Sequence, residues 1–144
     1  MSLAQKINTA LKTAMRERDK DKVAALRLIL AVVHNQEIAK KAPLTDEEMI
    51  ALLKTEAKKR QEALEIYLKN ERQELAQKEA FELKLIKTFL PEQLSADKIK
   101  ELVGQMKAEG ELPANFGEAM KQVMAKLKGR ADGGAVAQAV KAAL

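Results

Sequence analysis

The residues best suited to chemistry in this sequence are four cations near its C-terminus. They are Lys121, Lys126, Lys128 and Arg130. No acidic residue lies between the first of them and Asp132. The pattern predicts a helix that closes at Gly129, which places the last cations beside a turn. Cations grouped in this way could bind phosphate, so the segment predicts a protein that binds a polyanion rather than one that catalyses a reaction.

The turn after these cations is rich in glycine, and a further helix is predicted to begin behind Asp132. A helix start presents unpaired N–H groups that favour an anion, and Gly133 and Gly134 would let a phosphate approach the backbone. The alternative is a structural connection in which Gly129 is the C-cap and Asp132 is the N-cap. The Lys-Ser/Thr pair of a P-loop is absent. The residues alone leave both interpretations open.

The remaining residue types offer little for catalysis or metal binding. The chain has no cysteine and one histidine, His34, which excludes thiolate sites and histidine clusters. We therefore expect no cofactor and no metal. Arg27 lies in the most apolar segment, residues 23–33. We expect it to be buried and paired with Glu56 or Glu62 rather than to contact a ligand.

Composition predicts an all-α protein. The 144 residues are 47% hydrophobic and only 3% aromatic, and Ala, Leu, Lys, Glu and Gln, which are strong helix formers, are abundant. The N-terminus lacks the apolar core of a signal peptide, and no apolar run approaches the ~20 residues of a membrane span. We expect a cytoplasmic protein with no membrane partner.

The net charge of +5 is spread unevenly along the chain. Residues 1–43 carry nine Lys or Arg against four Asp or Glu, and residues 95–144 carry eight against six. Residues 44–94 carry nine against eleven, so the middle is mildly acidic. Basic ends are consistent with a polyanion partner.

Capping signals divide the chain into helices. Ser2 with Gln5 and Thr45 with Glu48 predict capping boxes, and Asp19 or Asp21 can cap the helix between them. The long helix after Thr45 either breaks around Asn70 or continues unbroken. Pro91 and Ser95 mark the clearest boundary. We predict a subdomain of about four helices over residues 1–90 and a three-helix tail subdomain over residues 95–144.

Several segments together carry a family resemblance. They are Phe89–Ser95, Phe116–Met124, Lys128–Gly133 with Val136, Leu26–Leu30 followed by Asn35 and Glu37, and Lys59–Ala63 followed by Tyr67. Their order and spacing resemble those of the GatB/YqeY family over essentially the whole chain. The family often has Lys where this chain has Gly134 and a polar residue where it has Ala137, which weakens the electrostatic case for this tail.

The resemblance implies an all-helical fold in two parts, related to the C-terminal helical and tail regions of the GatB component of the glutamine-dependent tRNA amidotransferase. It also implies a tail that clamps the body of a tRNA, with the chemistry in other domains. Carried over to this sequence, the tRNA-facing residues are Lys121, Lys126, Lys128, Gly129, Arg130 and Gly133.

The function expected from sequence and resemblance is that of a non-catalytic tRNA-binding accessory domain for translation. One alternative is a component of a carbon–nitrogen ligase that uses glutamine as nitrogen donor on aminoacyl-tRNA. Another is a helical scaffold that binds an aminoacyl-tRNA synthetase or amidotransferase through the long third helix. The chain shows no catalytic constellation, so we expect no enzyme activity from it alone.

Overall fold

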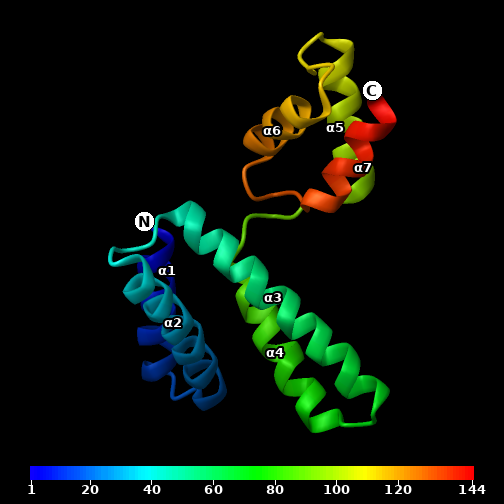
Figure 1. The fold of residues 1–144 in the computed structure, drawn as a ribbon. Helices are drawn as coiled ribbons and strands as arrows, with labels where there is room; N and C mark the ends of the chain where they lie inside the picture. The colour runs from blue at the N-terminus through cyan, green and yellow to red at the C-terminus, as the bar shows by residue number, and fades with distance from the viewer. The chain divides into compact units, whose positions relative to one another are not determined.

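The computed structural model describes all residues, 1–144, and contains seven α-helices and no strand (Figure 1). The helices are α1 (Leu3–Arg16), α2 (Lys20–Lys40), α3 (Asp46–Lys69), α4 (Gln73–Phe89), α5 (Ala96–Ala108), α6 (Phe116–Leu127) and α7 (Gly133–Ala143). The all-α fold predicted from composition is confirmed. The chain divides into two compact units, an N-terminal unit of Met1–Leu90 and a C-terminal unit of Pro91–Leu144.

The predicted capping residues begin the helices. Ser2 caps α1 and Thr45 caps α3, and each forms the reciprocal capping box with the residue three positions on. Of the two candidates for α2, the structure uses Asp19, which accepts a hydrogen bond from Lys22 N at 3.2 Å. Ser95 caps α5 in the same way. Each cap satisfies an N–H group that the helix itself leaves unpaired.

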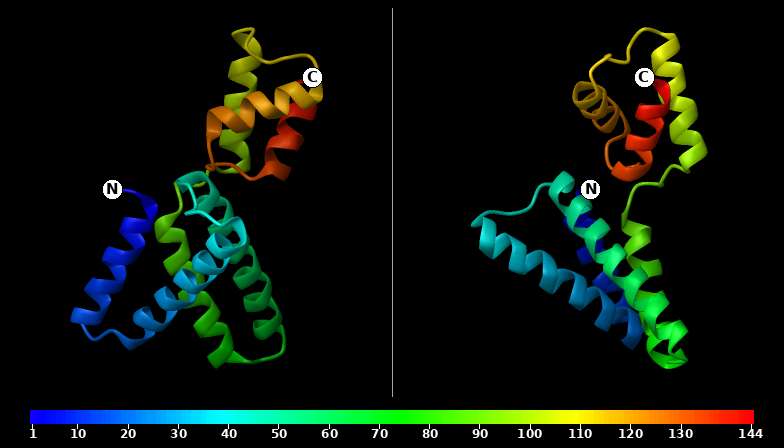
Figure 2. Two further views of the ribbon diagram at one scale, coloured as in Figure 1. Left: turned by 60° about the vertical axis from the view of Figure 1, so that its left-hand side comes forward. Right: turned by 45° about the vertical axis from the view of Figure 1, so that its right-hand side comes forward.

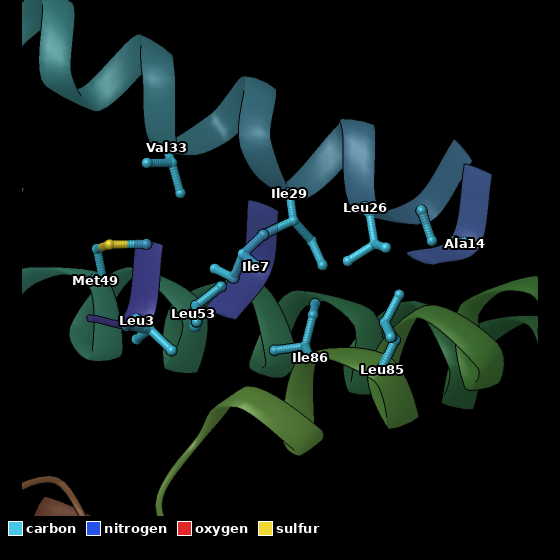
Figure 3. Packing of buried hydrophobic residues seen from close by; sticks show 11 residues of the cluster. Leu3, Ile7, Ala14, Leu26, Ile29, Val33, Met49, Leu53, Leu85 and Ile86 are labelled. Atoms are coloured by element: carbon cyan, nitrogen blue, oxygen red, sulfur yellow. The ribbon is translucent and has the colours of Figure 1, made fainter. Parts of the chain in front are cut away.

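The N-terminal unit is built from two antiparallel helical hairpins, α1–α2 and α3–α4 (Figures 1 and 2). All four helices contribute to one core (Figure 3). Ile7, Leu26, Met49, Leu53 and Ile86 are each at most 1% exposed. Since truncating such a side chain costs about 2–5 kcal/mol, this shared core holds the two hairpins together.

Of the two alternatives near Asn70, the structure shows the break, because α3 ends at Lys69 and α4 begins at Gln73. Glu71 adopts a left-handed conformation, with φ of 58°. The N–H of Arg72 donates to the carbonyl of Tyr67 at 2.8 Å and closes the end of α3. No glycine marks this turn, so the usual sequence signal for a helix end is missing.

The prediction for Arg27 is wrong. Leu26 and Ile29 are buried on the inner face of α2, but Arg27 is exposed, and no carboxylate lies within ion-pair distance of it. Successive residues are about 100° apart around a helix, so a residue next to the buried stripe points away from it. Although residues 23–33 form the most apolar segment, Leu28 is 45% exposed.

The buried ion pair forms within the α3–α4 hairpin instead. Arg60 on α3 places Nη1 3.5 Å from Glu56 and Nε 3.1 Å from Glu82 on α4. Glu56 and Glu82 are the buried charged residues of the chain, at 8% and 6% exposure. One guanidinium therefore serves two buried carboxylates.

The C-terminal unit consists of α5, α6 and α7 around a second core. Ile99 and Val103 from α5, Val123 from α6, and Val136 and Val140 from α7 are each at most 1% exposed. Helix α5 ends at Ala108, and Gly110, with φ of 73°, follows its C-cap Glu109 in the left-handed conformation that glycine favours. The small residues of α7 let it pack directly beside α5 and α6 (Figure 2).

Candidate nucleic-acid interface

The turn between α6 and α7, residues 128–132, is anchored to a segment far away in the sequence. Gln93 Nε2 donates to the carbonyl oxygen of Gly129 at 2.9 Å, and Leu94 N donates to that of Arg130 at 2.7 Å. Ala131 is 2% exposed and lies in the core of the C-terminal unit. The turn's carbonyl oxygens and its small side chain thus face the protein, which fixes the backbone that carries the cations.

Helix α6 is followed directly by two left-handed residues. Leu127 is its last residue, and Lys128 is the C-cap in a left-handed conformation with φ of 32°. Gly129 follows with φ of 77°, where glycine avoids the cost that a side chain would impose. The N–H of Arg130 donates to the carbonyl of Leu127 at 2.9 Å and completes the reversal.

Asp132 occupies the start of α7. Its carboxylate accepts a hydrogen bond from Ala135 N at 3.1 Å. Asp132 is therefore the N-cap of α7, as in the interpretation of this turn as a structural connection between helices. Gly133 has open space where a Cβ would lie, whereas a Cβ on Gly134 would lie 3.0 Å from Asp132 Oδ2. A phosphate at this helix start would therefore have to bind beside a carboxylate.

The four cations singled out from the sequence are all exposed or partly exposed. Lys126 Nζ lies 3.5 Å from Glu111 Oε2, but both side chains are about half exposed, so this ion pair is weak. Lys121, Lys128 and Arg130 have no carboxylate within ion-pair distance. Most of the positive charge at this turn is therefore free to attract an anion.

The structure does not gather all four cations into one cluster. Lys128 and Arg130 lie in the turn, and Lys126 lies in the last turn of α6. Lys121 is five residues before Lys126, which turns it about 140° around the helix axis. The exposed cations in or next to the turn are therefore Lys126, Lys128 and Arg130, and Gly133 and Gly134 beyond it are also exposed.

Sequence reasoning missed the residues that hold this turn in place. Gln93 donates to the carbonyl oxygens of both Pro91 and Gly129, at 2.8 and 2.9 Å. From its sequence, the segment around Pro91 is recognisable only as a boundary between helices. Within this segment the sequence signal is Gln93 itself, a polar residue directly after Pro91 and Glu92. No periodic pattern reveals its contact with a residue 36 positions further along the chain.

A groove of about 800 Å³ lies between α2 and α4 in the N-terminal unit. Leu28 and Phe81 contribute apolar surface, and Arg27, Lys78 and Glu74 contribute charges of both signs. Glu82 also lines it, and burial raises the pKa of its carboxyl against the opposing influence of Arg60. No group of three His, Asp or Glu side chains that could hold a metal ion is present.

One family model and two curated proteins match this chain. Residues 4–144 match the model of the family described as Yqey-like protein. The uncharacterized protein C22F3.15 of Schizosaccharomyces pombe is 34% identical over 89 residues, which cover 62% of this chain and 72% of that protein. The altered inheritance of mitochondria protein 41, mitochondrial, of Vanderwaltozyma polyspora is 32% identical over 126 residues. That match covers 81% of this chain but less than two thirds of the relative, 64%.

None of the seven helices combines the length and the apolar character that crossing a lipid bilayer requires.

Proposed function

Because the chain belongs to the Yqey-like protein family, we propose that it is a non-catalytic tRNA-binding accessory protein, related to the GatB component of the glutamine-dependent aminoacyl-tRNA amidotransferase. The observation that supports this proposal is the exposed cationic turn after α6, where Lys128 and Arg130 have no carboxylate partner. Its backbone is held by Gln93 and Leu94, so its cations project from a fixed support.

In this proposal the tRNA is recognised by its backbone and shape rather than by its bases. Single-strand binders stack bases on aromatic side chains. The one aromatic residue of the C-terminal unit is Phe116. It lies at the opposite end of α6, about 17 Å along the helix from Leu127, and Lys141 Nζ lies 5.8 Å from the centre of its ring. A turn with cations and no aromatic side chain suits phosphates and 2′-hydroxyls.

The same proposal assigns different roles to the two subdomains. The three-helix tail over residues 95–144 would hold the tRNA, and the four helices of residues 1–90 would form a separate subdomain. The proposal also includes the cytoplasmic location expected from the sequence. The word mitochondrial in the name of the Vanderwaltozyma relative describes that relative.

The experiment is filter binding of total tRNA across ionic strengths. The test variant carries Lys126→Ala, Lys128→Ala and Arg130→Ala together. It should bind tRNA more weakly, and its log–log slope of affinity against salt should become shallower by about two to three units, at ~0.7–0.9 per phosphate contact.

A matched control removes three exposed lysines of α5 in the same unit. They are Lys98, Lys100 and Lys107. The control keeps the wild-type slope if the turn is the binding surface. Equal slopes for wild type and the turn variant would rule the site out, and equal losses in both variants would show that only net charge matters.

A second candidate function is a scaffold that binds a synthetase or amidotransferase through α3. The observation that favours it is the apolar surface near the end of that helix, where Ile66 and Leu68 are 58% and 59% exposed. Capture of such an enzyme that survives high salt, and that is lost in Ile66→Asp with Leu68→Asp, would support the scaffold. Salt-sensitive tRNA binding alone would support the tRNA proposal.

A further inference from the structure

Four residues other than glycine adopt the left-handed conformation, and each lies one or two residues after the end of a helix. They are Arg18, Lys41, Glu71 and Lys128. A side chain in this conformation costs free energy that glycine avoids. Glycine most often occupies this place after a helix, so each of these four residues carries a side chain where glycine would cost less.

The α1–α2 turn, residues 17–19, shares three features with the cationic turn after α6. Arg16 ends α1, as Lys126 lies in the last turn of α6. Arg18, one residue after the C-cap Glu17, is left-handed with φ of 56°, whereas after α6 both the C-cap Lys128 and the following Gly129 are left-handed. Asp19 then caps the next helix, as Asp132 does. The same sequence of cation, left-handed cation and capping aspartate thus occurs once in each unit.

Exposed cations lie in this turn and on both sides of it. Helix α1 contains no acidic residue. Lys12, Arg16, Arg18 and Lys20 are exposed and have no carboxylate within ion-pair distance. The acids between Lys12 and Lys20 are Glu17 and Asp19, and Asp19 is engaged with Lys22 N. Asp21 follows Lys20, so four free cations stand against three acids, one of which serves as a cap, and the surface remains net positive.

Stabilisation of the helix dipole explains these cations only in part. Cations near a helix C-terminus are favourable, and Lys41 after α2 has the same advantage as Arg18 after α1. Lys41, however, follows Lys40, which pairs with Glu48, and it precedes the acidic run Asp46–Glu48. Lys41 therefore has the backbone of Arg18 without its cationic surroundings, which makes it the natural control.

We propose that the α1–α2 turn is a second phosphate-binding surface, formed by Lys12, Arg16, Arg18 and Lys20, that contacts the backbone of the same RNA as the tail. The inference rests on the proposed tRNA binding and adds a site to it. Residues 1–43 contain no Phe, Tyr or Trp, and the surface itself has no ring, so it holds phosphates and does not stack bases. It contributes affinity without sequence preference.

An anionic membrane is a weaker partner for this surface. A helix that lies on a membrane buries an apolar face among the lipids. The apolar face of α1, which includes Leu3 and Ile7, is already buried in the core of the N-terminal unit. The side of α1 that carries the cations is polar.

The test compares three glycine variants that share one backbone conformation. Arg18→Gly removes a cation from the proposed surface, Lys41→Gly removes a cation outside it, and Glu71→Gly removes no cation. Each variant places glycine where φ is between 56° and 63°, so each should fold with a Tm at or above that of wild type.

Binding of total tRNA is measured by filter retention across ionic strengths. Arg18→Gly should weaken binding and make the log–log salt slope shallower by about 0.7–0.9, the value for one phosphate contact. Lys41→Gly and Glu71→Gly should keep the wild-type slope. Combining Arg18→Gly with Lys12→Ala and Arg16→Ala should lower the slope by about two to three units.

Each outcome decides between the two proposals. If the turn variant of the C-terminal unit weakens binding and Arg18→Gly does not, the proposed function stands and the second surface is refuted. If Arg18→Gly weakens binding and the turn variant of the C-terminal unit does not, the tail site falls, and with it the inference that both units contact one RNA. Equal effects of Arg18→Gly and Lys41→Gly, or wild-type protein that retains no tRNA, overturn the inference. Arg18-dependent binding to phosphatidylserine vesicles without any change in tRNA binding overturns it as well.

Discussion

Arg60 on α3 lies between two buried carboxylates, and its Nε approaches Oε2 of Glu82 on α4 at 3.1 Å. The Nε group forms no well-aligned hydrogen bond despite this distance. The interaction is therefore mainly electrostatic, and it occurs where the side chains of Arg60 and Glu82 are 18% and 8% exposed. A buried ion pair of this kind contributes little to the net free energy of folding. Removing one partner, however, leaves the other charge buried and unpaired, which destabilises the protein.

Replacing the guanidinium should destabilise the protein strongly. Arg60→Met leaves Glu56 and Glu82 buried without their shared cation, which should lower the free energy of unfolding by about 3–5 kcal/mol at pH 7. Urea titration followed by circular dichroism measures this loss. Lys59→Met is the control, because Lys59 is 64% exposed and pairs with Glu56 only at 3.5 Å. A loss of the same size in both variants would contradict the assignment.

The charge on Glu82 should make stability depend on pH. Burial raises the pKa of its carboxyl above the ordinary value of 4.5, with Arg60 opposing the shift and Glu79 adding to it. Folding therefore favours the protonated form. The contribution of Glu82 to stability is fully present below the unfolded-state pKa and is lost as pH rises through the raised pKa.

Glu82→Gln removes this titration and provides the measurement. The difference in unfolding free energy between wild type and Glu82→Gln should shift in favour of the variant as pH rises from about 4 to 7. The variant retains Glu56 as a partner for Arg60 at 3.5 Å, so it should still fold. A difference that stays constant over this range would show that the carboxyl does not titrate as described.

The contact between Gln93 and the cationic turn should protect that turn from opening. Gln93→Ala removes two hydrogen bonds at 2.8 and 2.9 Å and should cost about 0.5–1.5 kcal/mol, because the side chain is exposed. Hydrogen exchange at the amide of Arg130 should become faster. Gln105→Ala, also exposed in the C-terminal unit, serves as the control and should leave this exchange unchanged.

The carboxylate at the start of α7 should oppose tRNA binding. Asp132→Asn keeps a good N-cap, so stability should stay within a few tenths of a kcal/mol. Removing the negative charge should strengthen tRNA binding by about 0.3–1 kcal/mol, which corresponds to about two- to fivefold. Asp97→Asn, in the first turn of α5, is the matched control. Unchanged affinity in Asp132→Asn would mean that no phosphate lies near this helix start.

Local signals were sufficient to predict most of the helices. Ser2, Asp19, Thr45, Ser95 and Asp132 each cap the helix that follows, because a capping side chain acts within three or four residues of its own position. Phe89–Ser95 was likewise predicted as a break between helices. The ends at Arg18, Lys41 and Glu71 were harder to place, since none of them is glycine.

What the sequence determined by itself is therefore the all-α fold, the helix starts and the set of cations that could bind an anion, since propensity, capping and charge are properties of short segments. Tertiary structure alone decided which charges are buried and which are free. Arg27 was expected to be buried and is exposed, whereas Arg60 pairs with Glu82 across two helices. Likewise, only the fold brings Gln93 to Gly129. These outcomes depend on how helices distant in sequence pack, and no local pattern encodes that arrangement.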